Sequence, residues 1–287
     1  MGVKELPDDL TDDLCNDGGK LCPELLPGHK VLWLIRHGQS TGNVAKEEAW
    51  TGDAAEGAHC HTRYTAYRQS LDHIDSPLTQ KGCEQAGETQ RLISAWEKKP
   101  ELVVCSALTR AIQTAAIMFA HELESGTARL VIRPELRECF ADNNENSGRP
   151  LAELRQCSQL RALPCWRNIE AALSDEATAE WGQHWDAHWA RGAGGAWQAH
   201  VSDPARHEAF SRWLAAQSER YVAIVSHWGT INNWLNRQPW TAEIERVPVS
   251  STWIASEWPT EGIARRFGVR NAEWIAVVLS PSTPTLG

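Results

Sequence analysis

The stretch VLWLIRHGQSTGNVA, residues 31–45, begins with an apolar run. This run ends abruptly at Arg36, which is followed by His37 and Gly38. Short β-branched and apolar runs bounded by polar residues are typical of buried strands. Besides VLWLIR from Val31, such runs are ELVVCS from Glu101, ARLVIRP from Ala128, YVAIVSH from Tyr221 and WIAVVL from Trp274. The opening stretch therefore predicts a core strand that carries a cation and an imidazole at its carboxyl end.

Helical segments are predicted between several of these strands. A helix from Thr79 to about residue 98 has Thr79 as N-cap and apolar residues, among them Leu92 and Ile93, at helical spacing. Further helices are predicted from Leu108 to about Leu123 and after Asp203. Strands that alternate with helices of this length predict an α/β fold with a mainly parallel central sheet and helices on both faces.

Two polar or Trp-rich segments interrupt this alternation, at about residues 44–75 and 140–202. We interpret them as insertions over the carboxyl end of the sheet, within a single domain that spans residues 30–287. Residues 1–29 form an acidic N-terminal extension. It has no apolar segment of the kind found in secretory signals, and no apolar run in the chain approaches membrane-spanning length.

The composition is that of a soluble globular protein, with 42% hydrophobic and 23% charged residues. The net charge of −9 would repel a nucleic-acid backbone, and no basic stripe offsets it. The eight cysteines show no C-x-x-C spacing. They are expected to be reduced thiols in a cytoplasmic protein that binds neither nucleic acid nor membranes.

Side chains that can bind a ligand or take part in catalysis follow the predicted strands. In an open α/β sheet, ligands bind beyond the carboxyl ends of the strands. Arg36 and His37 end the first strand, Arg110 follows the second beyond Ser106, and His227 ends the fourth. Glu138 lies just beyond the third.

This set of residues suits phosphoryl transfer. The planar, forked guanidinium groups of Arg36 and Arg110, which come from separate strands, can hold a phosphoryl group by charge-assisted hydrogen bonds. His37 is then the candidate nucleophile, because transfer to imidazole divides one displacement into two easier steps. His227 can stabilise the charge of the transition state, and Glu138 is the candidate acid that protonates the leaving alkoxide.

Five motifs occur in an order that resembles the histidine phosphatase superfamily, the phosphoglycerate mutase-like fold, and within it most closely the plant and algal type of phosphoglycerate mutase-like phosphatases. They are IRHGQSTGN to Asn43, SPLTQKGCEQA from Ser76, CSALTRAIQTA from Cys105, ELRE from Glu135 and VSHWG from Val225. The resemblance implies that His37 is phosphorylated and that Arg36, Arg110 and His227 complete the phosphate pocket. Asn43 and the backbone N–H of Trp228 match further phosphate contacts, Glu138 matches the proton donor, and no metal or other cofactor is implied.

The chain departs from the family pattern in places. Gln39 replaces the usual acidic residue after the R-H-G motif, and Trp228 replaces a small residue. The stretch from Glu135 lacks the E-R-H-Y-G motif of phosphoglycerate mutases, which weakens a mutase assignment. Glu135 remains an alternative to Glu138 as the acid.

Other patterns favour structural interpretations. His184 and His188, like His59 and His61, have spacings found in zinc sites, but H-E-x-x-H is absent and metal binding is not expected. Tryptophans at 181, 185 and 189 recur every four residues and predict a packing face of a helix. The glycines at 192, 194 and 195 follow no strand and predict no dinucleotide site. Three arginines in the insertions are alternative ligands for a second anionic group of a substrate, although each is expected on the solvated surface: Arg63, Arg68 and Arg149.

The sequence thus predicts a metal-independent phosphomonoesterase that acts on a small phosphorylated metabolite through a phosphohistidine. A phosphoglycerate mutase-type transfer uses the same intermediate and remains an alternative. A third interpretation is a non-catalytic sensor of a phosphorylated ligand. The substrate and the oligomeric state do not follow from the sequence.

Overall fold

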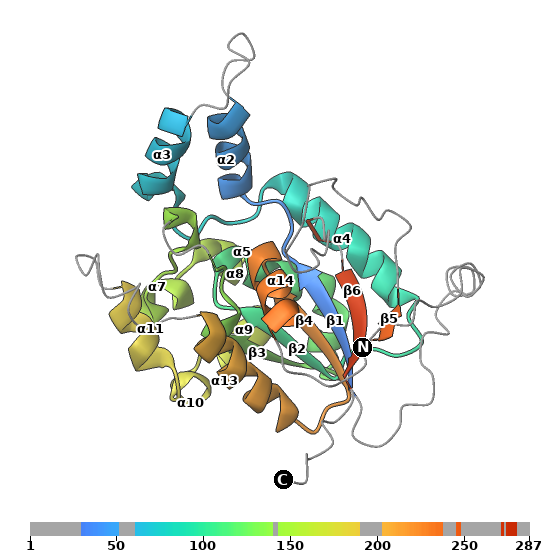
Figure 1. Cartoon of the computed structure of the whole chain (residues 1–287). Helices are drawn as coiled ribbons and strands as arrows, with labels where there is room; N and C mark the ends of the chain where they lie inside the picture. Colours follow the sequence, from blue (N-terminus) through green and yellow to red (C-terminus); the bar gives the residue numbers. More distant parts are fainter. Residues whose placement is uncertain are drawn as a thin grey trace, which may run out of the picture.

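A six-stranded sheet forms the centre of the protein (Figure 1). The structure is a computed structural model that describes residues 30–51, 61–139, 143–189, 203–237, 245–247, 271–272 and 274–279. Its strands are β1 (Lys30–Arg36), β2 (Leu102–Ser106), β3 (Arg129–Arg133), β4 (Tyr221–Ser226), β5 (Glu245–Val247) and β6 (Trp274–Leu279). Their order in the sheet is β3-β2-β4-β1-β6-β5. The predicted N-terminal extension, residues 1–29, lies outside the described residues.

The sheet is mainly parallel, as predicted. β1, β2, β3 and β4 run parallel to one another, whereas β6 pairs antiparallel with β1, and β5 antiparallel with β6. The register places Arg36 opposite Ser226 and Ser106 opposite Arg133. Because the parallel strands end at the same edge, the residues that follow them are gathered there.

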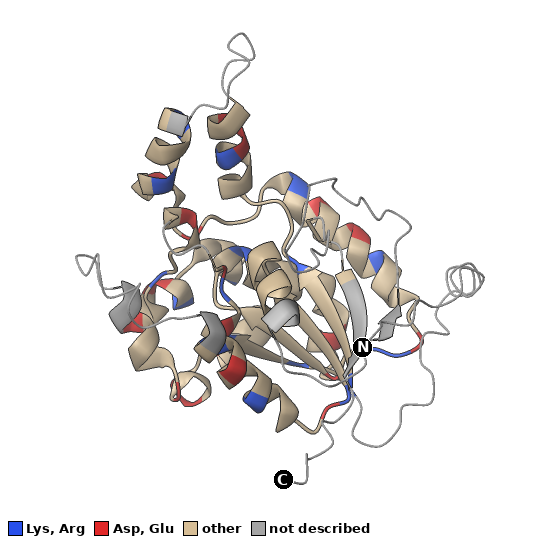
Figure 2. Ribbon diagram, in the orientation of Figure 1, with Lys and Arg blue, Asp and Glu red and all other residues tan. Residues whose placement is uncertain are grey.

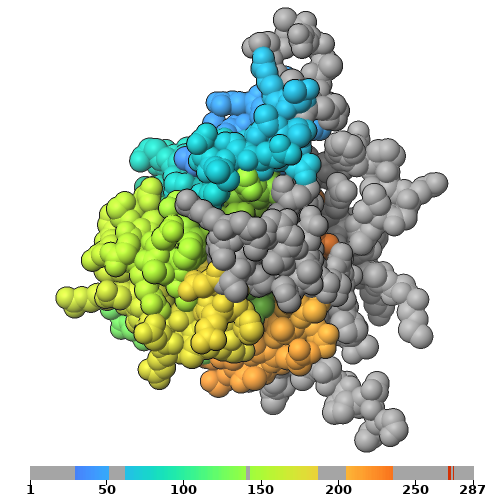
Figure 3. Space-filling model, turned by 90° about the vertical axis from the view of Figure 1, so that its left-hand side faces the viewer, coloured from blue at the N-terminus to red at the C-terminus, as the bar shows by residue number. Residues whose placement is uncertain are grey.

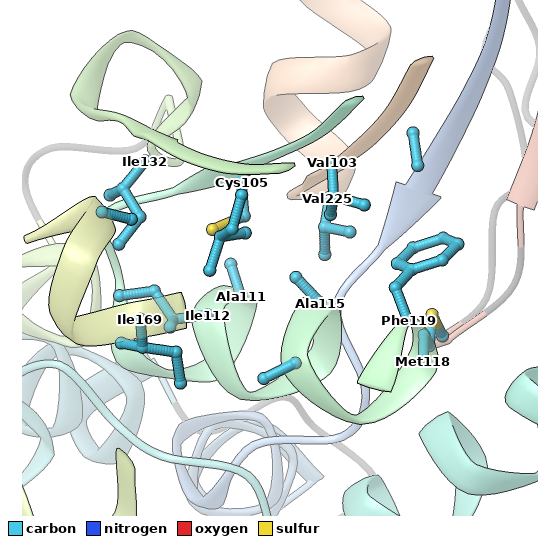
Figure 4. Packing of buried hydrophobic residues seen from close by; sticks show 14 of the residues in the cluster. Val103, Cys105, Ala111, Ile112, Ala115, Met118, Phe119, Ile132, Ile169 and Val225 are labelled. Carbon is cyan, nitrogen blue, oxygen red and sulfur yellow. The ribbon is translucent and has the colours of Figure 1, made fainter. Parts of the chain in front are cut away.

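Helices cover both faces of the sheet. On one face α5 (Thr109–Met118) contacts the strands, and α4 (Gln80–Ser94) packs beside α5. Figure 4 shows strand residues such as Val103 and Val225 pointing toward Ala111 and Ala115 of α5. The opposite face is covered by α13 (Asp203–Ala215) and α14 (Trp228–Arg237). Charged residues lie largely on the helices and at strand ends, whereas the central strands are mostly uncharged (Figure 2).

The predicted helices form, with differences at their ends. Thr79 caps α4, because its Oγ1 accepts a hydrogen bond from Gly82 N at 3.0 Å. Ile93 is buried, but Leu92 is 63% exposed and lies off the packing face of α4. The single helix predicted from Leu108 to Leu123 is interrupted at Phe119, where α6 (Ala120–Glu124) follows α5.

Apart from the helix predicted by the tryptophans at 181, 185 and 189, the helices of the two predicted insertions were not identified from the sequence. The first contains α2 (Thr41–Thr51), α3 (His61–Gln69) and the short helix η1 (Leu71–His73). The second contains η3 (Asn144–Asn146), α7 (Leu151–Arg155), α8 (Ser158–Arg161), α9 (Trp166–Ala172), α10 (Asp175–Thr178) and α11 (Gly182–Trp189), while η2 (Pro134–Leu136) directly follows β3. Figure 3 shows α3, in cyan, above the green and yellow surface of the second insertion.

The second insertion lies only partly at the end of the sheet. α9 packs against β3, and Ile169 is fully buried in the core beside Ile112 (Figure 4). The expected packing face is confirmed for Trp181 and Trp185, which are both buried. The side chain of Trp189 and the glycine patch at 192–195 lie outside the described residues. This insertion therefore extends the hydrophobic core, and η3 is the part that reaches the site described below.

In the part of the chain that the structure describes, no helix combines the length and the apolar character that a membrane span requires. Within these ranges the following cysteines form no disulfide bond: Cys83, Cys105, Cys139, Cys157 and Cys165.

Candidate active site

His37 lies directly after β1 and is almost completely buried, with 3% of its surface exposed. Its backbone N–H donates to Ser226 O at 2.9 Å, which continues the pairing of β1 with β4. Its ring Nδ1 lies 2.6 Å from Gly38 O. Because a carbonyl oxygen can only accept, Nδ1 carries the proton and Nε2 presents its lone pair.

Gly38 allows the chain to pass very close to α4. A Cβ at this position would lie 2.6 Å from Gly82 O, closer than side-chain carbons approach a backbone oxygen. The Gly38 N–H donates to Thr114 Oγ1 of α5 at 3.0 Å. The glycine of the R-H-G motif thus lets α4 and α5 hold the backbone beside His37.

Arg110, in the first turn of α5, is 2% exposed and faces His37. Its Nε donates to His37 Nε2 at 3.2 Å. Asp75 fixes the start of this helix, because its carboxylate accepts from Thr109 N at 2.8 Å and from Thr109 Oγ1 at 2.5 Å. The structure therefore points a guanidinium group at the imidazole lone pair.

His227 follows β4 and lies beside His37, with ring centroids 4.9 Å apart and ring planes inclined by 59°. Its Nε2 lies 2.9 Å from Ser106 Oγ at the end of β2. His227 is fully buried, and its Nδ1 has no hydrogen-bond partner within the described residues. A buried polar atom of this kind is expected where a ligand completes a site.

Burial and neighbouring cations keep both imidazoles neutral. The pKa of His37 is well below its usual value, chiefly because of burial and secondly because of the charges of Arg110 and Arg36. The pKa of His227 is also lowered well below the usual range, by burial first and then by Arg110. An unprotonated His37 is the form that can act as a nucleophile.

The neutral histidines predict a loss of stability in acid. Below about pH 6.5, the unfolded chain binds protons at these imidazoles that the folded chain does not, so the free energy of unfolding falls as pH decreases toward the lowered folded-state pKa values. Each residue contributes up to about 1.4 kcal/mol per pH unit in that range. Urea unfolding at several pH values should show a shallower pH dependence for the His37→Gln/His227→Gln double variant, and equal slopes would contradict the assignment.

Glu138 contacts the first turn of α14, the helix that directly follows His227. Its carboxylate accepts from Thr230 N at 3.1 Å, from Gly229 N at 3.3 Å and from its neighbour Cys139 N at 2.7 Å. Glu135, the alternative acid, forms a two-point ion pair with Arg133, with distances of 2.5 and 3.1 Å. Of the two candidate acids, Glu138 is therefore the one that contacts the segment directly after His227.

The remaining predicted residues lie around this centre. Arg36 ends β1, and its charge acts on both histidines. Asn43 lies in α2, and its Oδ1 accepts from Ser40 N at 3.2 Å and from Asn271 Nδ2 at 3.0 Å. Trp228 is the first residue of α14, where backbone N–H groups have no partner within the helix. The structure thus brings every residue of the predicted site to one edge of the sheet.

Several residues that support the site were missed by the sequence analysis. Arg206 of α13 donates to Glu135 O and Arg137 O at 2.6 Å each, and so holds the segment that carries Glu138. Glu145 O and Asn146 Oδ1 each accept from Arg110 at 2.8 Å. These contacts join segments that are far apart in the chain, so no local sequence motif could have predicted them.

The three arginines considered as ligands for a second anionic group lie in different parts of the fold. Arg149 pairs with the buried Asp75, its Nε 3.0 Å from Asp75 Oδ2, while Arg63 and Arg68 belong to α3. Within the described ranges, no group of three or more His, Cys, Asp or Glu side chains is arranged to hold a metal ion. His59 lies outside those ranges, and the side chains of His61 and His188 are not among those that the structure describes.

Comparisons with known proteins identify similar chains. The family model of the histidine phosphatase superfamily (branch 1) matches residues 58–246, more than half of the chain. Phosphoglycerate mutase-like protein 1 of Arabidopsis thaliana is 27% identical over 234 residues, which cover 74% of this chain and 73% of that protein. This likeness confirms the expected resemblance to plant-type phosphoglycerate mutase-like proteins.

Two solved structures are also similar to this chain. The alpha-ribazole phosphatase from Shigella flexneri is 25% identical with a TM-score of 0.40, over 72% of this chain and 78% of that chain. A phosphoglycerate mutase from Bacillus anthracis is 18% identical with a TM-score of 0.42, over 87% of this chain and 88% of that chain.

Proposed function

This chain belongs to the histidine phosphatase superfamily, and on that premise we propose that it is a metal-independent phosphomonoesterase that acts on a small phosphorylated metabolite. The observation that carries the proposal is the state of His37. Its Nδ1 is tied to Gly38 O, so the Nε2 lone pair points toward Arg110, beside the second buried histidine. This is the arrangement that a nucleophile beside an anion pocket requires.

In the first step, His37 Nε2 attacks the phosphorus atom of the bound ester and the bond between phosphorus and the alcohol oxygen breaks. Arg36, Arg110, His227 and the backbone N–H of Trp228 stabilise the charge on the phosphoryl oxygens. Glu138, in its protonated form, gives its proton to the departing alkoxide. The products are a free alcohol, phosphorylated His37 and the Glu138 carboxylate.

In the second step, water attacks the phosphorus atom of the phosphohistidine. Glu138, now a carboxylate, takes a proton from that water as the new bond forms. The bond between phosphorus and Nε2 breaks, which restores the imidazole lone pair and releases inorganic phosphate. The same two groups therefore serve both halves of the reaction, and each returns to its starting state.

A substrate screen tests this function directly. Wild-type protein is incubated with a panel of phosphate monoesters and with labelled phosphoglycerates, and free phosphate and isomerised product are measured together. The proposal predicts free phosphate as the main product. Isomerised phosphoglycerate without phosphate release would identify a mutase, whereas saturable ester binding without turnover would identify a phosphate-ester sensor.

The proposed role of Glu138 predicts a leaving-group effect. Glu138→Gln should lower kcat/KM for an alkyl ester such as glycerol 3-phosphate by about 100-fold. The effect on p-nitrophenyl phosphate should be much smaller, because p-nitrophenolate leaves without a proton. Glu135→Gln is the matched control, and its effect should be the same for both esters. A leaving-group dependence in the Glu135 variant instead would assign the acid role to Glu135.

A further inference from the structure

The orientation of Arg110 is set by the second insertion. Of the five N–H donors of its guanidinium group, the one on Nε reaches His37, one on Nη1 reaches Glu145 O and one on Nη2 reaches Asn146 Oδ1. One N–H on each terminal nitrogen remains for a ligand. Both protein contacts on the terminal nitrogens come from η3, so a displacement of η3 would turn the arginine away from the nucleophile.

The short helix η3 is held by the side chain of Glu145, which is 5% exposed. Its Oε1 accepts from Asn143 Nδ2 at 2.9 Å, and its Oε2 accepts from the hydroxyl group of Tyr67. The ammonium group of Lys46 lies 3.7 Å from Oε1. A three-residue 3₁₀ helix has little intrinsic stability, so it depends on such contacts for its position. Asn144 Nδ2 adds hydrogen bonds to Gln69 O at 2.8 Å and to Ser70 O at 3.3 Å.

The same carboxylate joins η3 to the first insertion. Tyr67 belongs to α3 and is buried, and its hydroxyl also lies 2.8 Å from Gly42 O at the start of α2. A Cβ at Gly42 would lie 2.7 Å from Glu145 Oε2, so the carboxylate packs directly against the α2 backbone next to Asn43. A carboxylate this deeply buried is tolerated only when it is well hydrogen-bonded.

We propose that Glu145 is a positioning residue, which couples α2 and α3 to Arg110 through its buried carboxylate and thereby aims the guanidinium group at His37 and at the phosphoryl oxygens. This role rests on the proposed phosphatase function but extends beyond it. In this way α3 of the first insertion contributes to phosphate affinity through Tyr67 without touching the phosphate. The connection runs from the Tyr67 hydroxyl to the Glu145 carboxylate, then through the Glu145 backbone to Arg110 and His37.

Substitutions that separate hydrogen bonding from packing test this proposal. Glu145→Leu removes the acceptors at similar volume and should weaken binding of inorganic phosphate about tenfold. Glu145→Gln keeps one acceptor oxygen and should restore the affinity to within about threefold of wild type. Tyr67→Phe should give an intermediate loss, because it removes the hydroxyl contact alone. Tyr64→Phe on the same helix is the matched control and should bind phosphate like wild type.

Two readouts distinguish positioning from simple destabilisation and from failure of the proposed function. Phosphate affinity, measured by calorimetry below the melting transition of each variant, does not require turnover. The pKa of His37, measured by NMR titration, should rise in Glu145→Leu and Tyr67→Phe, because Arg110 helps to lower it. Unchanged phosphate affinity and an unchanged His37 pKa in both folded variants would overturn the proposal, even if the wild type proved inactive on every ester.

Discussion

Replacing His37 with alanine is expected to lower kcat/KM for every phosphate ester by at least about 10⁴-fold, as removal of a catalytic nucleophile does in other enzymes. The expectation follows from the burial of the imidazole and from its tautomer. His37 is 3% exposed, and its Nδ1 proton is bound to Gly38 O. The neighbouring His227 differs from His37, because its Nε2 lies 2.9 Å from Ser106 Oγ. Steady-state kinetics on p-nitrophenyl phosphate measure the loss.

Binding of inorganic phosphate provides the control for this variant. His37→Ala keeps Arg36, Arg110 and the start of α14, so it should still bind phosphate, with an affinity within about tenfold of wild type. Loss of both binding and turnover would indicate a collapsed site and leave the role of nucleophile to a second variant, His37→Asn. Turnover of either folded variant within tenfold of wild type would contradict the role of His37.

Arg110→Lys is expected to lower kcat/KM by about 10³-fold, the effect of losing a guanidinium group that stabilises a phosphoryl transition state. Lysine keeps the charge but cannot reproduce three hydrogen bonds from one planar group. In the structure these bonds go to His37 Nε2, Glu145 O and Asn146 Oδ1, over 2.8 to 3.2 Å. The geometry of the fork, rather than its charge alone, is therefore expected to support catalysis.

Comparison with Arg110→Gln separates charge from geometry. The positive charge of Arg110 lowers the pKa of His37, so Arg110→Gln should raise that pKa, whereas Arg110→Lys should leave it nearer to the wild-type value. Both variants should lose activity. Arg129→Lys, which alters an exposed ion pair with Glu219, is the surface control and should be fully active. Near-wild-type kcat/KM in Arg110→Lys would show that catalysis does not need the planar geometry of the guanidinium group.

The sheet could be predicted because its strands are short, apolar runs with polar ends. VLWLIR corresponds to β1, which begins one residue earlier, at Lys30. The antiparallel pairing of β6 could not be predicted, because an apolar run carries no sign of its direction in the sheet. The interruption between α5 and α6 at Phe119 was also missed. The residues around Phe119 have a continuous helical pattern, which gives no sign that α5 ends there and α6 begins.

The residues around the phosphate pocket were suggested by motifs at strand ends, whereas the residues that hold them in place were not. Glu145 and Asn146 lie in a polar stretch without periodicity, and their role appears only when that stretch folds over Arg110. Arg206 lies on a helix that the sequence did predict, but its contacts with Glu135 and Arg137 carbonyls cross the fold. Such long-range contacts depend on tertiary packing, which a single sequence does not display.

The central claim is that Nε2 of His37 carries a phosphoryl group during the reaction. The most direct measurement is a rapid alkaline quench of wild-type protein during turnover of p-nitrophenyl phosphate, followed by peptide mapping with mass spectrometry. The account predicts one added phosphoryl group on the peptide that contains His37, absent from Arg110→Lys and from protein without substrate. Full turnover with an unmodified His37 at every quench time, or a phosphoryl group found only on another residue, would contradict it.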